Sequence, residues 1–180
     1  MQNLDNKIAP QINLIKLAAN NKYEFDLDES LDWIKGMLLE LNEHAKDHTP
    51  EELLEETSLT IWGDIEKKNK QDMGEHLLVT GEITAHYATE CIRTLKPMKV
   101  DLHVPFKVCF IDEELATTEM FAETDETWVD GEVYEIYYYN KRTVNFLDML
   151  HEQVFLNYNQ YPVLDADSKL EGADQETPES

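Results

Sequence analysis

The residue types that perform chemistry in enzymes are present in this chain, but not in the spacings that catalysis needs. The sequence has no GxSxG nucleophile motif, no P-loop and no GxGxxG turn, and only six glycines to build loops that cradle phosphate. Carboxylates are so numerous that finding two of them together carries no information. We therefore expect a protein that is not an enzyme and that binds no cofactor and no small-molecule substrate.

A metal site could begin at His44 and His48, which are four residues apart with Asp47 between them. No third ligand is nearby, and the segment ends a helix just before Thr49-Pro50. A second pair, His86 and His103, falls on the polar side of predicted strands. Such a pair needs a cleft and an orienting carboxylate before it can transfer protons. We predict neither a metal site nor a catalytic site.

Arg93, Lys96 and Lys99 form a basic cluster in a chain that is otherwise acidic. Arg93 continues an apolar strand face but stands at its end, where a guanidinium could reach RNA phosphate or a carboxylate of a partner. The alternative is an ion pair within the fold, for example with Glu152. A second basic run, at residues 67–70, is expected to be a solvated turn.

The net charge limits the classes of molecule that this chain can bind. Lys and Arg number 15 and Asp and Glu number 38, which gives a formal charge of −23. Such a chain repels nucleic acid at long range, because phosphate binding depends on basic side chains. It attracts basic proteins, although the charge could also serve solubility alone.

The cysteines and the apolar runs indicate the compartment. Only Cys91 and Cys109 are present, without a CxxC pair, which is typical of a reducing environment. The N-terminal residues have no signal-peptide pattern, and no apolar run is long enough to span a membrane. We expect a cytoplasmic protein that does not contact membranes.

Hydrophobic periodicity predicts an α+β fold. Apolar residues three or four apart predict a helix over 31–45, with Asp28 or Ser30 as N-cap, and Thr49 could cap a short helix that ends near Glu56. Alternating patterns predict strands at five places, namely 11–17, 23–27, 59–65, 77–91 and 100–110.

The last two of these strands form a long central hairpin with one apolar face. A loop centred between Lys96 and Pro97 would place Tyr87 opposite Phe106 and Glu90 opposite His103. A slip by an even number of residues keeps the apolar face inward, so only even slips compete with this register. The antiparallel sheet could be open or barrel-like.

The C-terminal third alternates between acidic and apolar segments. Residues 112–135 contain ten carboxylates and no Lys or Arg, which predicts a long solvated loop anchored by Trp128 and Val129. Residues 135–139 predict a strand whose tyrosines pack in the core rather than stack on bases. Asn145 could cap a final helix with Leu147, Leu150, Val154 and Phe155 on its inner face. We predict one domain over 1–164 and a disordered acidic tail over 165–180.

Two motifs in this arrangement resemble a known family. The hairpin segment 90–97 reads ECIRTLKP, and the helical segment 145–156 reads NFLDMLHEQVFL before Tyr161-Pro162-Val163. Together, in this order and over roughly 77–169, they resemble the YceD family, which is associated with accumulation of large-subunit ribosomal RNA. Thr94 stands where the family pattern has its second cysteine, and 164–169 contains none. A four-thiolate metal site therefore cannot form from these positions, and we interpret Cys91 as a small buried hydrophobe.

The resemblance implies a role in biogenesis of the large ribosomal subunit. The residues suggest an acidic scaffold that binds a basic ribosomal protein or assembly factor, and the candidate contact residues are Arg93, Lys96, Lys99, Glu90, His103 and Glu152. The alternative is direct RNA binding through Arg93, Lys96 and Lys99, which the net charge disfavours.

Overall fold

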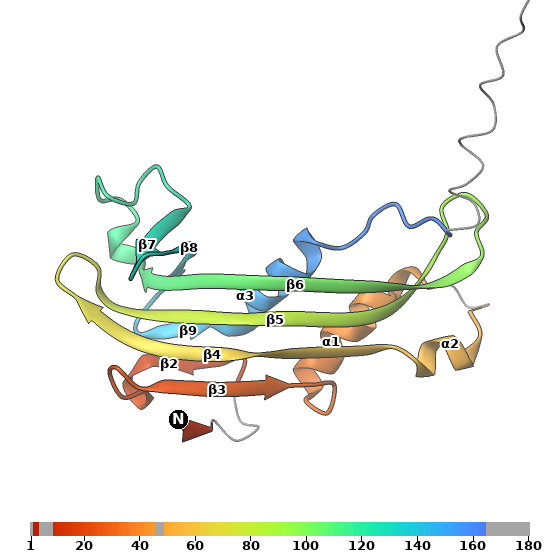
Figure 1. Cartoon of the computed structure of the whole chain (residues 1–180), viewed down its shortest axis with the longest axis horizontal. Coiled ribbons are helices and arrows are strands. Elements are labelled where there is room, and N and C mark those ends of the chain that lie inside the picture. The colour runs from red at the N-terminus through yellow and green to blue at the C-terminus, as the bar shows by residue number, and fades with distance from the viewer. Residues whose placement is uncertain (1, 4–8, 46–48, 165–180) are drawn as a thin grey trace, which may run out of the picture.

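A computed structural model describes residues 2–3, 9–45 and 49–164. A seven-stranded sheet dominates it (Figure 1), in the order β1-β3-β4-β5-β6-β8-β7. Its strands are β1 (Gln2–Asn3), β3 (Lys22–Leu27), β4 (Ser58–Lys70), β5 (Gly74–Glu90), β6 (Pro97–Asp112), β7 (Glu126–Val129) and β8 (Glu132–Tyr139). Within the described residues β1 and β7 are the two edges and do not pair with each other, so the sheet is open and not a closed barrel.

The remaining elements lie on one face of this sheet or at its ends. β2 (Gln11–Asn13) and β9 (Thr143–Asn145) form a separate two-stranded sheet, and the helices are α1 (Asp32–Leu41), α2 (Glu51–Glu55) and α3 (Phe146–Leu156). Figure 1 shows α1 and α3 behind the long strands β4, β5 and β6. Most pairings in the large sheet are antiparallel, but β1 with β3 and β6 with β8 are parallel. The fold is therefore α+β with a mixed, mainly antiparallel sheet.

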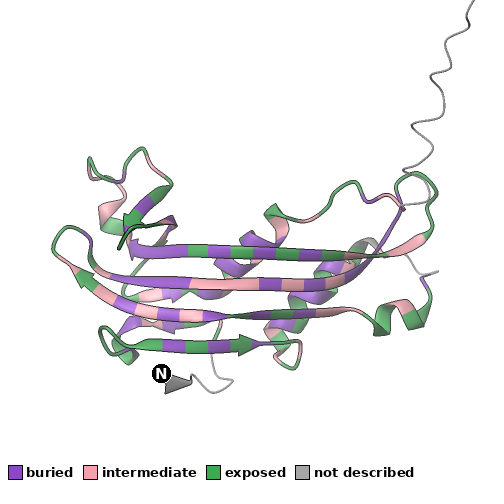
Figure 2. Ribbon diagram, in the orientation of Figure 1, coloured by how far each residue is buried: buried purple, intermediate pink, exposed green. Residues whose placement is uncertain are grey.

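The main core lies between the sheet and these helices. It collects alternate residues of the strands, which Figure 2 shows as alternating buried and exposed bands, together with Ile34, Leu41, Phe146 and Leu150 from the helices. Because successive side chains of a strand point to opposite faces, the other face of β3–β6 carries the polar residues of the pattern. No helix among the described residues covers the middle of that face (Figure 1).

The central hairpin has a different register from the one a loop centred at Lys96-Pro97 would give. Glu90 pairs with Pro97, so the turn centres between Arg93 and Thr94, and Tyr87 lies opposite Val100 instead of Phe106. The two registers differ by six residues, an even number, and the apolar face is kept. The expected opposition of Glu90 and His103 is wrong, since Thr84 is the partner of His103.

Residues 112–135 are not a solvated loop. They form a short 3-10 turn, Glu113–Leu115, followed by β7 and the start of β8, and they lie beside the start of β5 and the end of β6. A second apolar cluster lies beneath this insertion, made of Met73, Leu78, Cys109, Ile111, Phe121, Val129, Tyr134 and Ile136. Val129 anchors the segment as predicted, whereas the Trp128 side chain is 72% exposed.

The turn between β7 and β8 explains why the insertion is ordered. Asp130 and Gly131 both have positive φ, 54° and 89°. Two central residues in this conformation are typical of a type I′ hairpin turn, for which Asp-Gly is a preferred sequence. An acidic segment therefore folds back as a hairpin and buries Phe121, Val129 and Tyr134 against the sheet.

The helix ends agree only in part with the capping predictions. The Asn145 side chain accepts a hydrogen bond from the Asp148 amide and caps α3, as predicted. Neither Asp28, Ser30 nor Thr49 caps a helix, because the N-cap positions of α1 and α2 are Leu31 and Pro50. The buried side of α3 is formed by Phe146, Met149, Leu150, Gln153 and Val154, with Leu147 and Phe155 only partly buried. The first predicted strand is also shorter, because a 3-10 turn, Leu14–Lys16, follows β2.

Candidate interaction surfaces

The tip of the central hairpin brings three of the predicted contact residues into one neighbourhood. Arg93 and Lys96 are exposed in the turn, and Glu90 is buried at the end of β5. The turn is held by hydrogen bonds across it and by a bond from the Ile92 amide to the Pro162 carbonyl. The tip is therefore a defined structure, joined to the segment that follows α3.

The other three predicted contact residues, Lys99, His103 and Glu152, lie outside this turn. The Lys99 ammonium is 2.8 Å from the Glu56 carboxylate. His103 lies further along β6, 3.9 Å from a Glu82 oxygen. Glu152 is exposed on α3 and lies near Tyr137. Burial is the main reason that the pKa of Tyr137 is raised, and the nearby carboxylates of Glu135 and Glu152 raise it further. Among the described residues no ion pair links Glu152 to Arg93.

A hollow of roughly 420 Å³ opens beside the hairpin tip. Its lining is mixed and consists of Thr89, Glu90, Cys91, Ile92, Leu95, Tyr158, Gln160 and Pro162. Cys91 is fully buried, as its place on an apolar strand face predicts. A hydrogen bond with the Thr94 side chain lowers the pKa of the Cys91 thiol and outweighs the opposing effect of burial. By contrast, burial raises the pKa of Cys109 to about 12.

The second basic run, Lys67–Lys70, is not a solvated turn. These residues end β4, and the Lys67 side chain is only 10% exposed. Its ammonium donates to the Leu14 carbonyl at 2.9 Å and lies 3.0 Å from Glu75. The prediction failed because an aliphatic stem can be buried while its charged end reaches a partner at the edge of the fold.

The lysines on the uncovered face of the sheet are held by carboxylates of the same chain. Lys68 and Lys70 lie 2.6 and 2.9 Å from Asp130 in the β7–β8 turn. Lys107 lies 2.8 Å from Glu132 in β8, and Lys22 lies 2.8 Å from Asp64 in β4. The insertion is therefore bound to the sheet by ion pairs as well as by its apolar cluster, and these cations are partly neutralised.

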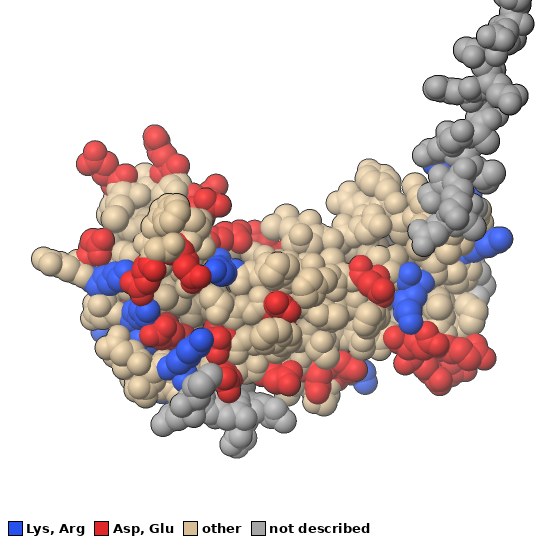
Figure 3. All heavy atoms as spheres, viewed as in Figure 1, with Lys and Arg blue, Asp and Glu red and all other residues tan. Residues whose placement is uncertain are grey.

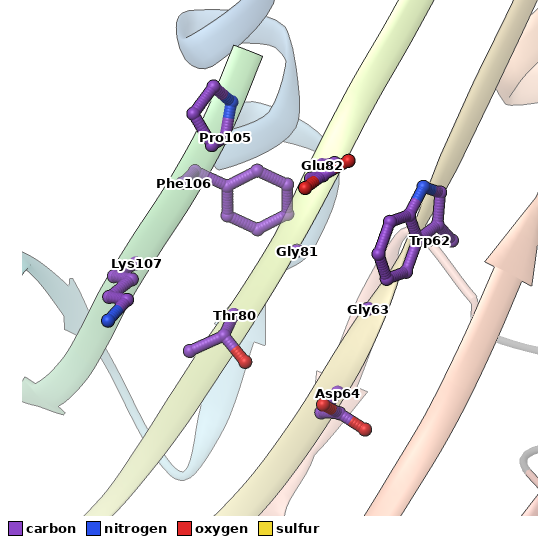
Figure 4. A pocket seen from close by; sticks show the side chains of 9 residues that line it. All are labelled: Trp62, Gly63, Asp64, Thr80, Gly81, Glu82, Pro105, Phe106 and Lys107. Atoms are coloured by element: carbon purple, nitrogen blue, oxygen red, sulfur yellow. The ribbon is translucent and has the colours of Figure 1, made fainter.

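The middle of the uncovered face carries an exposed tryptophan between two acids. Asp26 on β3, Trp62 on β4, Glu82 on β5 and Pro105 on β6 are direct cross-strand neighbours in one row. The Trp62 side chain is 51% exposed. Figure 4 shows the indole on β4 and the Glu82 carboxylate on the neighbouring strand.

This row borders an open hollow of roughly 450 Å³. The lining residues are Trp62, Gly63, Asp64, Thr80, Gly81, Glu82, Pro105, Phe106 and Lys107 (Figure 4). Gly63 is buried and Gly81 is half-buried, so these two glycines contribute only main-chain atoms to the wall of the hollow. No sequence pattern singled out this hollow, although Trp62 at a polar position of an alternating strand is the signal that could have found it.

Charge is unevenly spread over the surface. In Figure 3 acidic side chains gather over the insertion around β7 and over α2, and basic side chains lie mainly near the β4–β5 turn and the hairpin tip. Within the described residues no three His, Cys, Asp or Glu side chains are grouped closely enough to hold a metal ion. In the same part of the chain no helix has both the length and the apolar character required to cross a bilayer.

Comparison with protein families gives a match that covers the central hairpin and the C-terminal elements. The model of the family described as "Large ribosomal RNA subunit accumulation protein YceD" matches residues 79–180, which is more than half of the chain. The chain belongs to the YceD family. Comparisons with curated proteins and with solved structures give no match.

Some of the candidate surfaces lie inside the range matched by the family and others lie outside it. The hairpin tip, the insertion and α3 lie inside it, whereas Asp26 and Trp62 lie in the N-terminal part of the chain. Membership in the YceD family associates the protein with accumulation of large-subunit ribosomal RNA. The partner and the mechanism do not follow from membership.

Proposed function

We propose that the protein is a non-enzymatic, cytoplasmic factor in biogenesis of the large ribosomal subunit, which binds a basic ribosomal protein or assembly factor through its acidic surface. Family membership supports the process. The observation that supports the mechanism is the fixed position of the acidic insertion, whose turn is tied by Asp130 and Glu132 to the lysines of the sheet.

The insertion separates two classes of carboxylate. Asp130 and Glu132 make its ion pairs with the sheet, whereas Glu119, Glu123 and Glu126 are exposed and form no ion pair among the described residues. The second class is available to attract a basic partner over a distance of about one Debye length, roughly 8–10 Å at moderate salt. The two tasks, anchoring and attraction, are thus assigned to different residues.

The test is retention of purified large-subunit ribosomal proteins, stripped of RNA, by the full-length protein at low salt. A variant with Glu119, Glu123 and Glu126 changed to Gln should retain less and show a weaker salt dependence. The matched control changes Glu51, Glu52 and Glu55 on α2 to Gln, which alters the net charge equally. Equal retention by both variants and the wild type would remove the insertion from the mechanism.

A second candidate is direct RNA binding at the hairpin tip. It is favoured by the exposure of Arg93 and Lys96 in one turn, and opposed by the net charge of −23. Changing Arg93, Lys96 and Lys99 to Gln should weaken binding of large-subunit ribosomal RNA and reduce the slope of affinity against salt. An unchanged slope would exclude this surface.

A further inference from the structure

The row formed by Asp26, Trp62, Glu82 and Pro105, here called the Trp62 row, exposes a large aromatic side chain on the uncovered face. Trp62 lies in the interior of the sheet, with β3 on one side and β5 on the other, yet half of its side chain faces solvent. Directly opposed side chains on neighbouring antiparallel strands have Cβ atoms only about 4.5–5.5 Å apart. The indole therefore has the Asp26 carboxylate on one flank and the Glu82 carboxylate on the other.

Neither of these two carboxylates takes part in the lysine ion pairs of the uncovered face. Asp26 is exposed and forms no ion pair among the described residues, and among the same residues Glu82 lies within 4 Å of no lysine or arginine, only of the His103 ring at 3.9 Å. Lys107, which lines the hollow, is paired with Glu132, and Lys22 on β3 is paired with Asp64. The face thus keeps its cations paired and leaves acids beside the tryptophan.

An aromatic face flanked by carboxylates is complementary to a cation with a flat apolar surface. Tryptophan is the best cation–π partner among the side chains, and arginine is the cation that most often occupies such sites. The guanidinium can stack on the indole and donate hydrogen bonds in its own plane toward carboxylates on either side. A phosphate backbone would be repelled by the same two acids.

We propose that Trp62, Asp26 and Glu82 form an acceptor for an arginine side chain of a basic protein segment that lies across the open face of the sheet. This inference rests on the proposed function, because it names how the basic partner is recognised. The insertion supplies long-range attraction and the Trp62 row supplies local selection. It extends the binding surface into the N-terminal part of the chain, outside the residues matched by the family.

The first test uses two synthetic peptides of equal length and charge, one alternating arginine with serine and the other lysine with serine. The wild-type protein should bind the arginine peptide more tightly and quench Trp fluorescence. Trp62→Ala should lose roughly three- to five-fold in affinity for the arginine peptide, the equivalent of an exposed cation–π contact, and should lose the preference over lysine. Trp128→Ala removes the other strongly exposed tryptophan. It should keep both the affinity for the arginine peptide and the preference for arginine over lysine.

A second variant separates a failure to fold from a loss of recognition. Asp26→Asn with Glu82→Gln leaves the indole in place and should weaken both peptides, with the Trp62 fluorescence retained. The α2 variant Glu51→Gln with Glu52→Gln, which also removes two negative charges, is its control and should bind as the wild type does. Arginine preference that persists in Trp62→Ala, or equal weakening in the α2 control, would overturn the acceptor.

The failure of this inference is distinguishable from the failure of the proposed function. If the wild type and Trp62→Ala retain the same basic ribosomal proteins equally, the acceptor is wrong and the acidic-scaffold function stands. If the wild type retains none of them but binds the arginine peptide through Trp62, the acceptor is correct and its partner lies outside the ribosome.

Discussion

Gly63 and Gly81 lie directly opposite each other on β4 and β5, in a row that continues to Phe25 on one side and Phe106 on the other. A Cβ atom on Gly63 would lie 2.2 Å from the Thr80 carbonyl oxygen, and one on Gly81 would lie 2.4 Å from the Trp62 carbonyl oxygen. Both contacts are with main chain, which cannot move without distorting the pairing. The glycines therefore fix the close approach of the two strands beneath the Trp62 row.

Replacing either glycine of this pair with alanine should destabilise the protein by about 1–3 kcal/mol, the usual cost of forcing extra atoms into a packed site. The measurement is the free energy of unfolding by urea. Gly36→Ala is the matched control, since Gly36 is exposed in α1 and an added Cβ meets nothing within 4 Å. It should stabilise by about 0.5–1 kcal/mol, because alanine is the better helix former. Equal effects at Gly63 and Gly36 would contradict the close approach.

Lys67 joins two parts of the fold that are far apart in sequence. Its ammonium donates to the Leu14 carbonyl and pairs with Glu75. Lys67→Met keeps the aliphatic stem but removes the donor to the Leu14 carbonyl and leaves Glu75 with Arg142 alone, at 3.7 Å. It should cost about 2–3 kcal/mol of unfolding free energy. Lys35→Met on the exposed side of α1 should change it by less than about 0.5 kcal/mol. A neutral result at Lys67 would show that water satisfies both partners.

The apolar face of the hairpin was predictable from sequence because alternation specifies which side of a strand is buried. It does not specify how far two strands slide, since every even slip keeps the same face inward. The loop fixes the slip, and here Leu95 adopts a positive φ of 55° in a turn centred three positions earlier than expected. A leucine gives no sequence signal for that conformation. The expected neighbour of His103 was wrong for this reason.

The prediction of a solvated loop over 112–135 was wrong because it gave weight to the charge of the segment and not to its turn sequence. Ten carboxylates suggested solvation, yet Asp130-Gly131 between apolar-containing segments is a strong hairpin signal. For the Trp62 row the sequence offers one signal, a tryptophan at a polar position of an alternating strand, but it does not identify the neighbours of that tryptophan. Asp26, Trp62 and Glu82 come from three strands, and their meeting depends on two registers that local patterns do not determine.

The ion pairs of Asp130 give the insertion a measurable acid sensitivity. Hydrogen bonds from Lys68 and Lys70 lower the pKa of Asp130 to about 2. A carboxyl whose pKa is depressed in the folded state stabilises it above the ordinary pKa and loses that effect as pH falls toward the folded value. The melting temperature of the wild type should thus exceed that of Asp130→Asn above pH 4, and the gap should close between about pH 4 and pH 2.

Asparagine is a suitable replacement at this position because it tolerates the positive φ of the turn. The effect should be small, since exposed ion pairs contribute little, and high salt should reduce it further. Glu126→Gln, a neighbouring exposed acid of β7, is the control and should show no such closing gap. A gap that is constant from pH 6 to pH 2 would mean that the turn does not depend on the Asp130 charge.

His76 gives the stability of the fold a second pH dependence, closer to neutral pH. As with Asp130, stability is expected to fall as the pH falls. Its side chain is fully buried on β5, and Nδ1 lies 2.9 Å from the Gly74 carbonyl oxygen. Burial lowers the pKa of His76 below its ordinary value of 6.5, and the nearby Lys70 and Lys68 add to this. The unfolded chain therefore binds a proton that the folded chain resists, so stability is complete above about pH 6.5 and falls as the pH drops below it.

His76→Asn tests this dependence, because the amide can still donate to the Gly74 carbonyl but does not titrate. The unfolding free energy should be measured from pH 8 to pH 5 in both proteins. The wild type should lose more stability across this range than the variant, whatever their difference at pH 8. His103→Asn, which alters an exposed histidine of the uncovered face, is the control for the general effect of removing an imidazole. Parallel curves for the wild type and His76→Asn would show that the buried ring accepts its proton without cost to the fold.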